Sequence, residues 1–251
     1  MSNITNTRKE EFKGSMQVKA SCKTPEGFAS FPHLNRPDEY MGKKQYKVDL
    51  RIDPSNPESA AFIEEVKVWE AKHKVVQAQN IKASIKDIPE DSANPKHKKA
   101  IDKANVMLAT LENDDYKSLL IEEYDNDSGQ PTGMFKLRAK CNAGGVARDG
   151  KEYKIQPKIY TASGRVALED APIITAGSTL RLNLDISTYE MPSSGYVGIS
   201  VRLKDVLIVK IGGGADSGGS NPFGGDDAYK PDTFSAPEAT SGDEDDSEEG
   251  Y

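Results

Sequence analysis

Period-two alternation of apolar and polar residues is the feature that most limits what this chain can fold into. It occurs in six stretches, at residues 16–23, 44–52, 135–141, 153–160, 180–187 and 197–204. Alternation places one set of side chains on a buried face and the other in solvent, so each stretch predicts a half-buried β-strand. The phase shifts near Asp205, which indicates a bulge. About six strands separated by Gly and Pro predict a mainly β fold, a small antiparallel barrel.

A helical insertion is expected between the second and third strands, at about residues 56–112. Asn56 can cap a helix that has Pro57 in its first turn, and Asn94 with Pro95 offers a second start. Apolar residues then recur at spacings of three and four, which predicts one buried face per helix. These residues are Phe62, Val66, Trp69, His73 and Val76 in the first helix, and Ile101, Ala104, Leu108 and Leu111 in the second.

The remaining segments of the body predict irregular structure. Residues 1–14 read as a loose basic arm, and residues 24–42 contain three prolines and two glycines, so they predict a loop. The stretch from the end of the second helix to Gly133 also reads as loop.

The last forty residues, 212–251, differ sharply in charge from the rest. They contain eleven Asp and Glu residues and one Lys, a net charge of −10, whereas residues 1–211 carry 32 Lys and Arg against 29 Asp and Glu, or +3. Low hydrophobicity with high like charge cannot offset chain entropy. We therefore expect a domain at residues 1–211 and a disordered acidic tail at 212–251. The tail could compete for an anion that the body binds, or it could only solubilise the protein.

Several classes of protein are disfavoured by what the sequence lacks. The two cysteines have no paired spacing, and no apolar run is long enough for a signal peptide or a membrane span, which predicts a soluble intracellular protein. The three histidines have no metal-ligand spacing, and no catalytic grouping stands out, so we expect no metal, no cofactor and no catalytic residue. Residues 145–151 match G-x-x-x-x-G-K, but Glu152 and a predicted strand follow, which excludes a phosphate loop.

The polar faces of the predicted strands indicate nucleic-acid binding. One strand carries three cations and no acid on its polar face, and a strand expected to pair with it carries two cations and an aromatic residue. Cations contact phosphates and aromatic rings stack on bases, so this pattern favours nucleic acid over a merely solvated sheet face. The residues selected in this way are Lys136, Arg138 and Lys140, then Lys154, Lys158 and Tyr160, with Lys47 and Arg51 extending the surface.

Four motifs and the tail resemble those of the T7-type bacteriophage single-stranded DNA-binding proteins. The motifs are YKVDL at 46–50, FKLR at 135–138 leading to Cys141, EDAPII at 169–174 followed by Gly177-Ser178, and the strand from Val197-Gly198 to Val209. The acidic tail ending in an aromatic residue, Tyr251, is similar too. The resemblance covers most of the body.

The resemblance implies an oligonucleotide-binding (OB) fold with an inserted helical segment. It also implies a homodimer bridged by the tails, which would contact the phage DNA polymerase and helicase-primase. Family DNA contacts would fall on Lys43 or Lys44, Lys136, Arg138, and Tyr189 in the turn after the Leu184 strand. Partner contacts would fall on Asp243, Glu244, Asp245, Asp246, Glu248, Glu249 and Tyr251. Two residues depart from the family pattern. Met191 stands where a second aromatic residue is expected, and the chain ends in Tyr251 where the family has Phe.

The sequence therefore favours a non-enzymatic single-stranded DNA-binding protein of phage DNA replication, recombination and repair, acting in the cytoplasm of an infected bacterium. Weak sequence specificity is expected, because phosphate contacts and stacking read no base edge. Two alternatives stay open: an acidic-tailed interaction scaffold or nucleic-acid mimic, and an accessory nuclease or ligase on the same fold.

Overall fold

The structure is a computed structural model, which describes residues 2–12, 15–40, 42–89, 92–113, 115–147 and 149–212. The predicted acidic tail, with its partner-binding residues 243–251, lies outside the described residues.

Strands are the commonest regular structure in the described chain, and two helices interrupt them. Before the helices come β1 (Ile4–Phe12), β2 (Ser15–Lys23), β3 (Gly27–Tyr40) and β4 (Lys43–Ile52). The helices are α1 (Pro57–Ile85) and α2 (Pro95–Glu112). After them come β5 (Ile121–Tyr124), β6 (Pro131–Asn142), β7 (Gly144–Val146), β8 (Glu152–Lys154), β9 (Lys158–Thr161), β10 (Gly164–Val166), β11 (Thr179–Met191) and β12 (Tyr196–Lys210). The mainly β prediction is confirmed.

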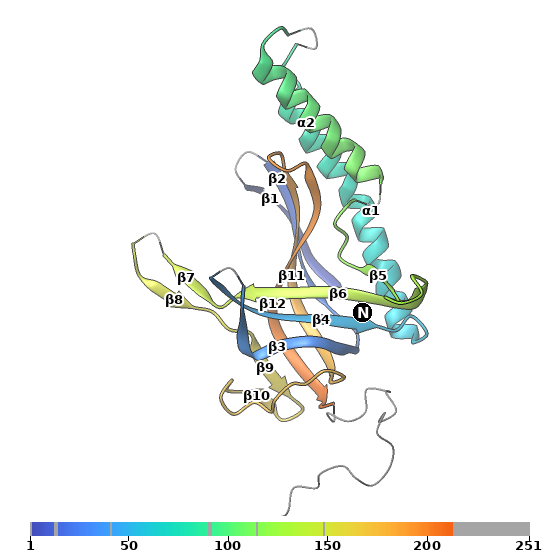
Figure 1. Cartoon of the computed structure of the whole chain (residues 1–251), viewed down its shortest axis with the longest axis vertical. Coiled ribbons are helices and arrows are strands. Elements are labelled where there is room, and N and C mark those ends of the chain that lie inside the picture. The colour runs from blue at the N-terminus through green and yellow to red at the C-terminus, as the bar shows by residue number, and fades with distance from the viewer. Residues whose placement is uncertain are drawn as a thin grey trace, which may run out of the picture. The chain divides into compact units, whose positions relative to one another are not determined.

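Five strands close into a barrel. Around the ring, β3 pairs with β4, β4 with β6, β6 with β12, β12 with β11, and β11 returns to β3 (Figure 1). If the five barrel strands are numbered in chain order, their spatial order around the ring is 1-2-3-5-4-1. The β6–β12 pairing is parallel, whereas the sequence predicted a wholly antiparallel barrel. This is an OB-like barrel. The strands β1 and β2 extend the sheet beyond β11.

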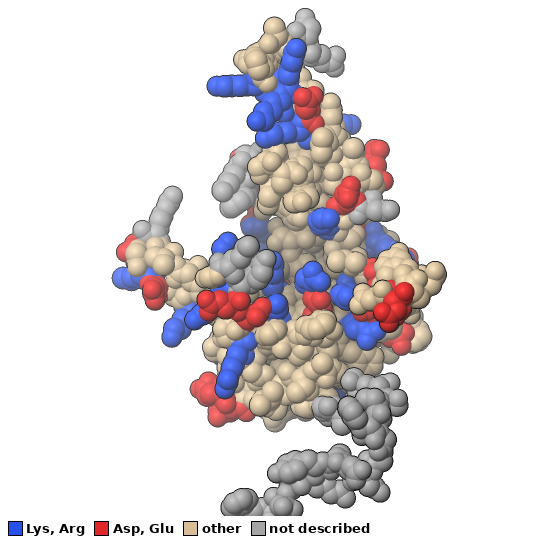
Figure 2. Space-filling view, viewed as in Figure 1, with Lys and Arg blue, Asp and Glu red and all other residues tan. Residues whose placement is uncertain are grey.

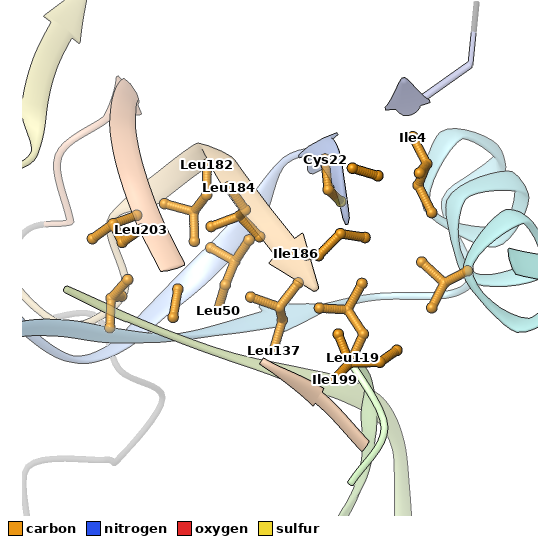
Figure 3. Close-up of a cluster of buried hydrophobic side chains, with 14 of the residues drawn as sticks. Ile4, Cys22, Leu50, Leu119, Leu137, Leu182, Leu184, Ile186, Ile199 and Leu203 are labelled. Atoms are coloured by element: carbon orange, nitrogen blue, oxygen red, sulfur yellow. The ribbon is translucent and has the colours of Figure 1, made fainter. Parts of the chain in front are cut away.

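The apolar sides of the alternating strands fill the barrel. Leu50, Leu137, Leu184 and Leu203 come from four different barrel strands and are at most 2% exposed. Figure 3 shows them pointing into one cluster with side chains from β2 and the segment before β5. The period-two pattern therefore identified inward-facing residues of these four barrel strands, whereas Met16 and Tyr153, on the apolar sides of two other stretches, are exposed.

The two helices begin where their capping residues predict. Asn56 Oδ1 accepts a hydrogen bond from the Glu58 amide at 2.9 Å, and Asn94 Oδ1 accepts one from Lys96 at 3.0 Å. The apolar stripe of α1 is buried from Phe62 to His73, and α1 packs against β2, β11 and α2. Figure 1 shows the helices side by side at one end of the barrel. Neither helix in the described part of the chain combines the length and the apolar composition that a membrane-spanning segment needs.

Two segments predicted to be irregular are strands. The expected basic arm contains β1, which pairs antiparallel with β2 and has a register shift between Thr5 and Arg8. The expected loop at 24–42 contains β3, with register shifts between Ser30 and His33 and between His33 and Asp38. Neither segment shows the local alternation on which the prediction relied. β3 contains prolines, which strands tolerate at bulges, and β1 is held by pairing with β2 and by Ile4, whose side chain is buried and whose amide donates to Glu65.

The region around the predicted 153–160 strand also differs. It divides into β8, which pairs with β7 in a separate two-stranded sheet, and β9, which pairs with β12 and β10. It does not pair with the 135–141 strand, because β4 and β12 already occupy both edges of β6. The loop expected before Gly133 contains β5 and the start of β6. The predicted bulge is confirmed: Leu184 pairs with Leu203 and Asn183 with Asp205, which leaves Lys204 as the extra residue.

Candidate nucleic-acid interface

The outward residues of β3, β4 and β6 form three cross-strand rows, called here the basic face. Directly paired residues in antiparallel strands project on the same side of a sheet. The rows are Phe28–Arg51–Lys136, Ser30–Asp49–Arg138 and His33–Lys47–Lys140. Arg202 of β12 continues the third row beside Lys140. The predictions that Lys136, Arg138 and Lys140 share a face, and that Lys47 and Arg51 extend it, are therefore confirmed as geometry.

The basic face also carries acids, although β6 itself contributes none to it. Neighbouring strands supply carboxylates, which the pattern within one strand cannot reveal. Asp49 pairs with Arg138 at 3.0 Å, Asp38 with Lys47 at 2.5 Å, and Glu123 with Arg51 at 2.7 Å. Figure 2 shows Lys and Arg side chains with Asp and Glu among them over β4 and β6.

These ion pairs perturb the groups that make them. The hydrogen bond and charge of Asp49 raise the pKa of Arg138. Burial alone would raise the pKa of Glu123, but its hydrogen bond with Arg51 and the nearby Lys136, 3.6 Å away, hold that pKa below its usual value. The second and third rows contain exposed cations, Arg138 and Lys140, whereas Lys136 in the first row is half-buried.

An open groove of about 1180 Å³ adjoins the basic face. Arg138 and Lys140 line it and so belong to both surfaces. Its other lining residues come from β2, α1, α2, the segment before β5, β5 itself, β11, the β11–β12 turn and β12. They include polar groups from Gln17, Asn80 and Ser84, the cation Lys117, and apolar side chains from Met107, Met191, Pro192, Ile199 and Val201. Cations beside an apolar floor match what a phosphate chain with unpaired bases requires.

A buried glutamine fixes one wall of the groove. Gln77 of α1 is fully buried, and its side-chain amide donates to the carbonyls of Tyr189 and Gly198, both at 3.1 Å. Its oxygen accepts from the Tyr116 hydroxyl at 3.2 Å. Gln77 therefore connects the helices to the β11–β12 hairpin.

Lys117 reaches the groove through a close backbone contact. It bridges to Gly198 of β12, where the Ile199 amide donates to the Lys117 carbonyl at 2.8 Å. A Cβ on Gly198 would lie 2.5 Å from the Lys117 carbonyl oxygen and from its Cβ, so only glycine fits. No sequence pattern indicated Lys117, because this contact joins segments about eighty residues apart.

Tyr189 is placed differently from the prediction. It lies within β11, paired with Gly198, and is half-buried rather than exposed in a turn, because β11 continues to Met191. Burial, followed by the neighbouring Tyr196, raises the pKa of Tyr189. One exposed ring near Tyr189 that the sequence did not indicate is Tyr196, which is 52% exposed and whose ring centre lies 5.7 Å from the Lys117 ammonium nitrogen. Its place in the sequence, directly before the alternating strand at 197–204, could have indicated a ring at the end of a strand.

Other predicted residues lie away from the groove lining. Lys154 belongs to the separate β7–β8 sheet, and Lys158 on β9 pairs with Asp205 of β12. Tyr160 lines a second pocket of about 660 Å³ together with Arg181 and Asp205. Lys43 and Lys44 are exposed at the start of β4, where Lys44 lies 3.7 Å from Glu39. The structure thus brings Arg138, Lys140 and Tyr189 to one groove and keeps Lys47, Arg51 and Lys136 beside the first two on the basic face. Lys154, Lys158 and Tyr160 lie on other strands, away from both surfaces.

Two curated proteins are similar to this chain in sequence. The single-stranded DNA-binding protein of Escherichia phage T7 is 25% identical over 198 residues, covering 76% of this chain and 75% of that protein. The single-stranded DNA-binding protein of Enterobacteria phage T3 is 24% identical over 199 residues, with the same coverage of each chain. No protein-family model matches the chain. The resemblance to the T7-type proteins inferred from the motifs is confirmed.

The fold is also similar to a solved structure. The crystal structure of gp2.5, a single-stranded DNA-binding protein encoded by bacteriophage T7, matches with a TM-score of 0.52 and 20% identity. The match covers 79% of this chain and 92% of that one. The match shows that the two proteins share the barrel fold.

Proposed function

We propose that this chain, which resembles the T7-type phage proteins, binds single-stranded DNA on an OB-fold barrel without strong sequence specificity. The observation that carries the proposal is the position of Arg138 and Lys140, which belong to the basic face and also line the groove. A polyanion can therefore pass from the basic face into the groove by way of Lys140, Arg138 and Lys117. The sequence similarity to two phage proteins of this description supports the same function.

The chemistry of the groove favours unpaired bases. Met191 and Val201 present apolar surface on which bases can lie, and the cations Lys117, Arg138 and Lys140 can neutralise phosphates. Neither contact reads the edge of a base, so all sequences should bind similarly. No step of this function is catalytic.

The proposal is tested by comparing single-stranded and duplex oligonucleotides over a range of salt concentrations. If about four phosphates are neutralised, log K should fall against log salt with a slope near −3, from roughly −0.7 per phosphate for single strands. Tighter binding of single strands, with a slope of this size, supports the proposal. Equal affinity for duplex, or no salt dependence, would contradict it and favour the acidic-tailed interaction scaffold.

We further propose that residues 212–251 form a separate acidic tail that recruits other proteins of phage replication. This segment contains eleven acidic residues and ends in the aromatic Tyr251. Its charge and its terminal ring are complementary to a basic pocket with an apolar floor on a DNA polymerase or helicase-primase. The same tail would compete with DNA for the basic body and bridge a homodimer in the cytoplasm of the infected host. Truncation after Ile211 should tighten single-strand binding at low salt and abolish polymerase and helicase-primase binding. Unchanged DNA affinity in the truncated protein would make the tail a passive solubiliser.

A further inference from the structure

Phe31 lies in a bulge of β3. Ser30 pairs with Asp49 and His33 pairs with Lys47, so Phe31 and Pro32 together face the single residue Val48. One extra residue opposite a single partner is the arrangement of a β-bulge, which commonly redirects a side chain.

The bulge turns an aromatic ring outward at the expense of backbone strain. Ala29 is buried, so strict alternation would place Phe31 inside with Val48, which is also buried. Phe31 instead has φ of 48° and is 74% exposed. A positive φ disfavours a bulky residue, and glycine would occupy this position without that strain. A strained backbone that exposes an apolar ring is an observed outlier of the kind that indicates function.

The cross-strand rows on either side of Phe31 contain cations. Ser30, before it, belongs to the row that ends in Arg138, and His33, after the bulge, belongs to the row of Lys47 and Lys140. The bulge therefore falls between two rows of the basic face. An aromatic ring beside cations is the combination that proteins use to hold single strands, with a base stacked on the ring and phosphates on the cations.

We infer that Phe31 is a stacking site for a nucleobase on the basic face, separate from the groove. The inference rests on the proposed function, since a base reaches this ring only if the face binds nucleic acid. The cations of these two rows favour a nucleic acid as the occupant over an apolar protein surface, because phosphates would neutralise Lys140 and Arg138 while the ring takes the base.

The sharpest test is Phe31→Trp, because the chain has one tryptophan, Trp69, which is only 7% exposed. Oligothymidylate should quench the fluorescence of the introduced indole strongly. Val68→Trp is the matched control, because Val68 is 67% exposed on α1 and lines neither pocket. Quenching in Phe31→Trp no greater than in Val68→Trp, with the DNA bound to both, would overturn the inference.

A second pair of variants separates stacking from folding. Phe31→Gly suits the positive φ, so the thermal unfolding midpoint should stay the same or rise. Its affinity for single-stranded DNA should fall by about 5- to 150-fold, the range for loss of one stacked base. Phe31→Tyr keeps the ring and should bind like the wild type.

The outcomes distinguish this inference from the proposed function. If the wild type fails to bind single-stranded DNA, the proposed function fails and the inference fails with it. If the wild type binds and Phe31→Gly binds equally well, only the stacking site is wrong. If Phe31→Gly weakens self-association in light scattering without changing DNA affinity, the ring belongs to an interface between copies of this chain and the inference is likewise overturned.

Discussion

Asp49 and Arg138 are direct cross-strand partners on β4 and β6, and the Arg138 guanidinium donates two hydrogen bonds to the Asp49 carboxylate, at 3.0 Å and 3.2 Å. A bidentate contact of this kind occupies the same donors that would contact a phosphate. The central cation of the basic face is thus already paired before any ligand arrives.

We therefore expect Asp49→Asn to tighten binding of single-stranded DNA by several-fold at low salt. The substitution removes a negative charge that competes with phosphate, and the gain should shrink as salt screens the exposed charges. Stability should change by less than about 1 kcal/mol, because the Arg138 side chain is 64% exposed. Fluorescence anisotropy at two salt concentrations measures the effect.

Asp149→Asn, which removes the exposed Lys151 pair in the β7–β8 turn, is the control and should change nothing. Weaker binding by Asp49→Asn would show that Asp49 positions Arg138 productively.

Replacing Arg138 and Lys140 together with alanine should weaken single-strand binding of all sequences alike. Two lost phosphate contacts should flatten the salt slope by about 1.4. Lys136→Ala should have a smaller effect, because Lys136 is half-buried and close to Glu123. Lys204→Ala with Arg165→Ala removes the same charge from residues that do not line the groove. Equal losses in both double variants would point to general electrostatics and exclude a localised site.

The two tyrosines at the β11–β12 hairpin should separate folding from binding. Tyr196→Ala should reduce DNA affinity with little change in stability, because its ring is exposed next to Lys117. Tyr189→Ala should lower the free energy of unfolding by roughly 2 kcal/mol, since its half-buried ring packs in the strand. Urea unfolding and DNA titration of each variant test this. A stable Tyr189→Ala protein with lost DNA binding would return Tyr189 to the role that the sequence suggested.

His73 should make stability depend on pH. It is buried on α1 against the edge of Trp69, and its Nδ1 has no hydrogen-bond partner in the described part of the chain. Burial, and then the charges of Lys72 and Lys9, lower its pKa in the folded state from 6.5. As the pH falls below 6.5, the unfolded chain takes up a proton that the folded chain resists, so stability should decline until the pH passes the lowered pKa. Above 6.5 the full stability is present.

The variant His73→Phe keeps an aromatic ring beside Trp69 and removes the titration. Urea unfolding of both proteins above pH 6.5 and about one unit below should show a loss in the wild type that the variant lacks. Burial raises the pKa of Glu70, on the same helix, which acts in the opposite direction and is common to both proteins. An identical pH dependence in the two would show that His73 is not the group responsible.

What the sequence by itself determined was local. The alternation around Leu50, Leu137, Leu184 and Leu203 identified four of the five barrel strands, because a period of two fixes which side chains face inward whatever the partner strand is. Asn56 and Asn94 marked the helix starts, because capping needs only the adjacent backbone. The tertiary structure decided which strands are neighbours. Asp49 meets Arg138, and Lys117 meets Gly198, only through contacts between distant segments. It also decided that residues 27–40 form a strand. Prolines interrupt the local pattern there, but pairing with β4 and β11 holds β3 in the barrel, and its bulge turns Phe31 outward.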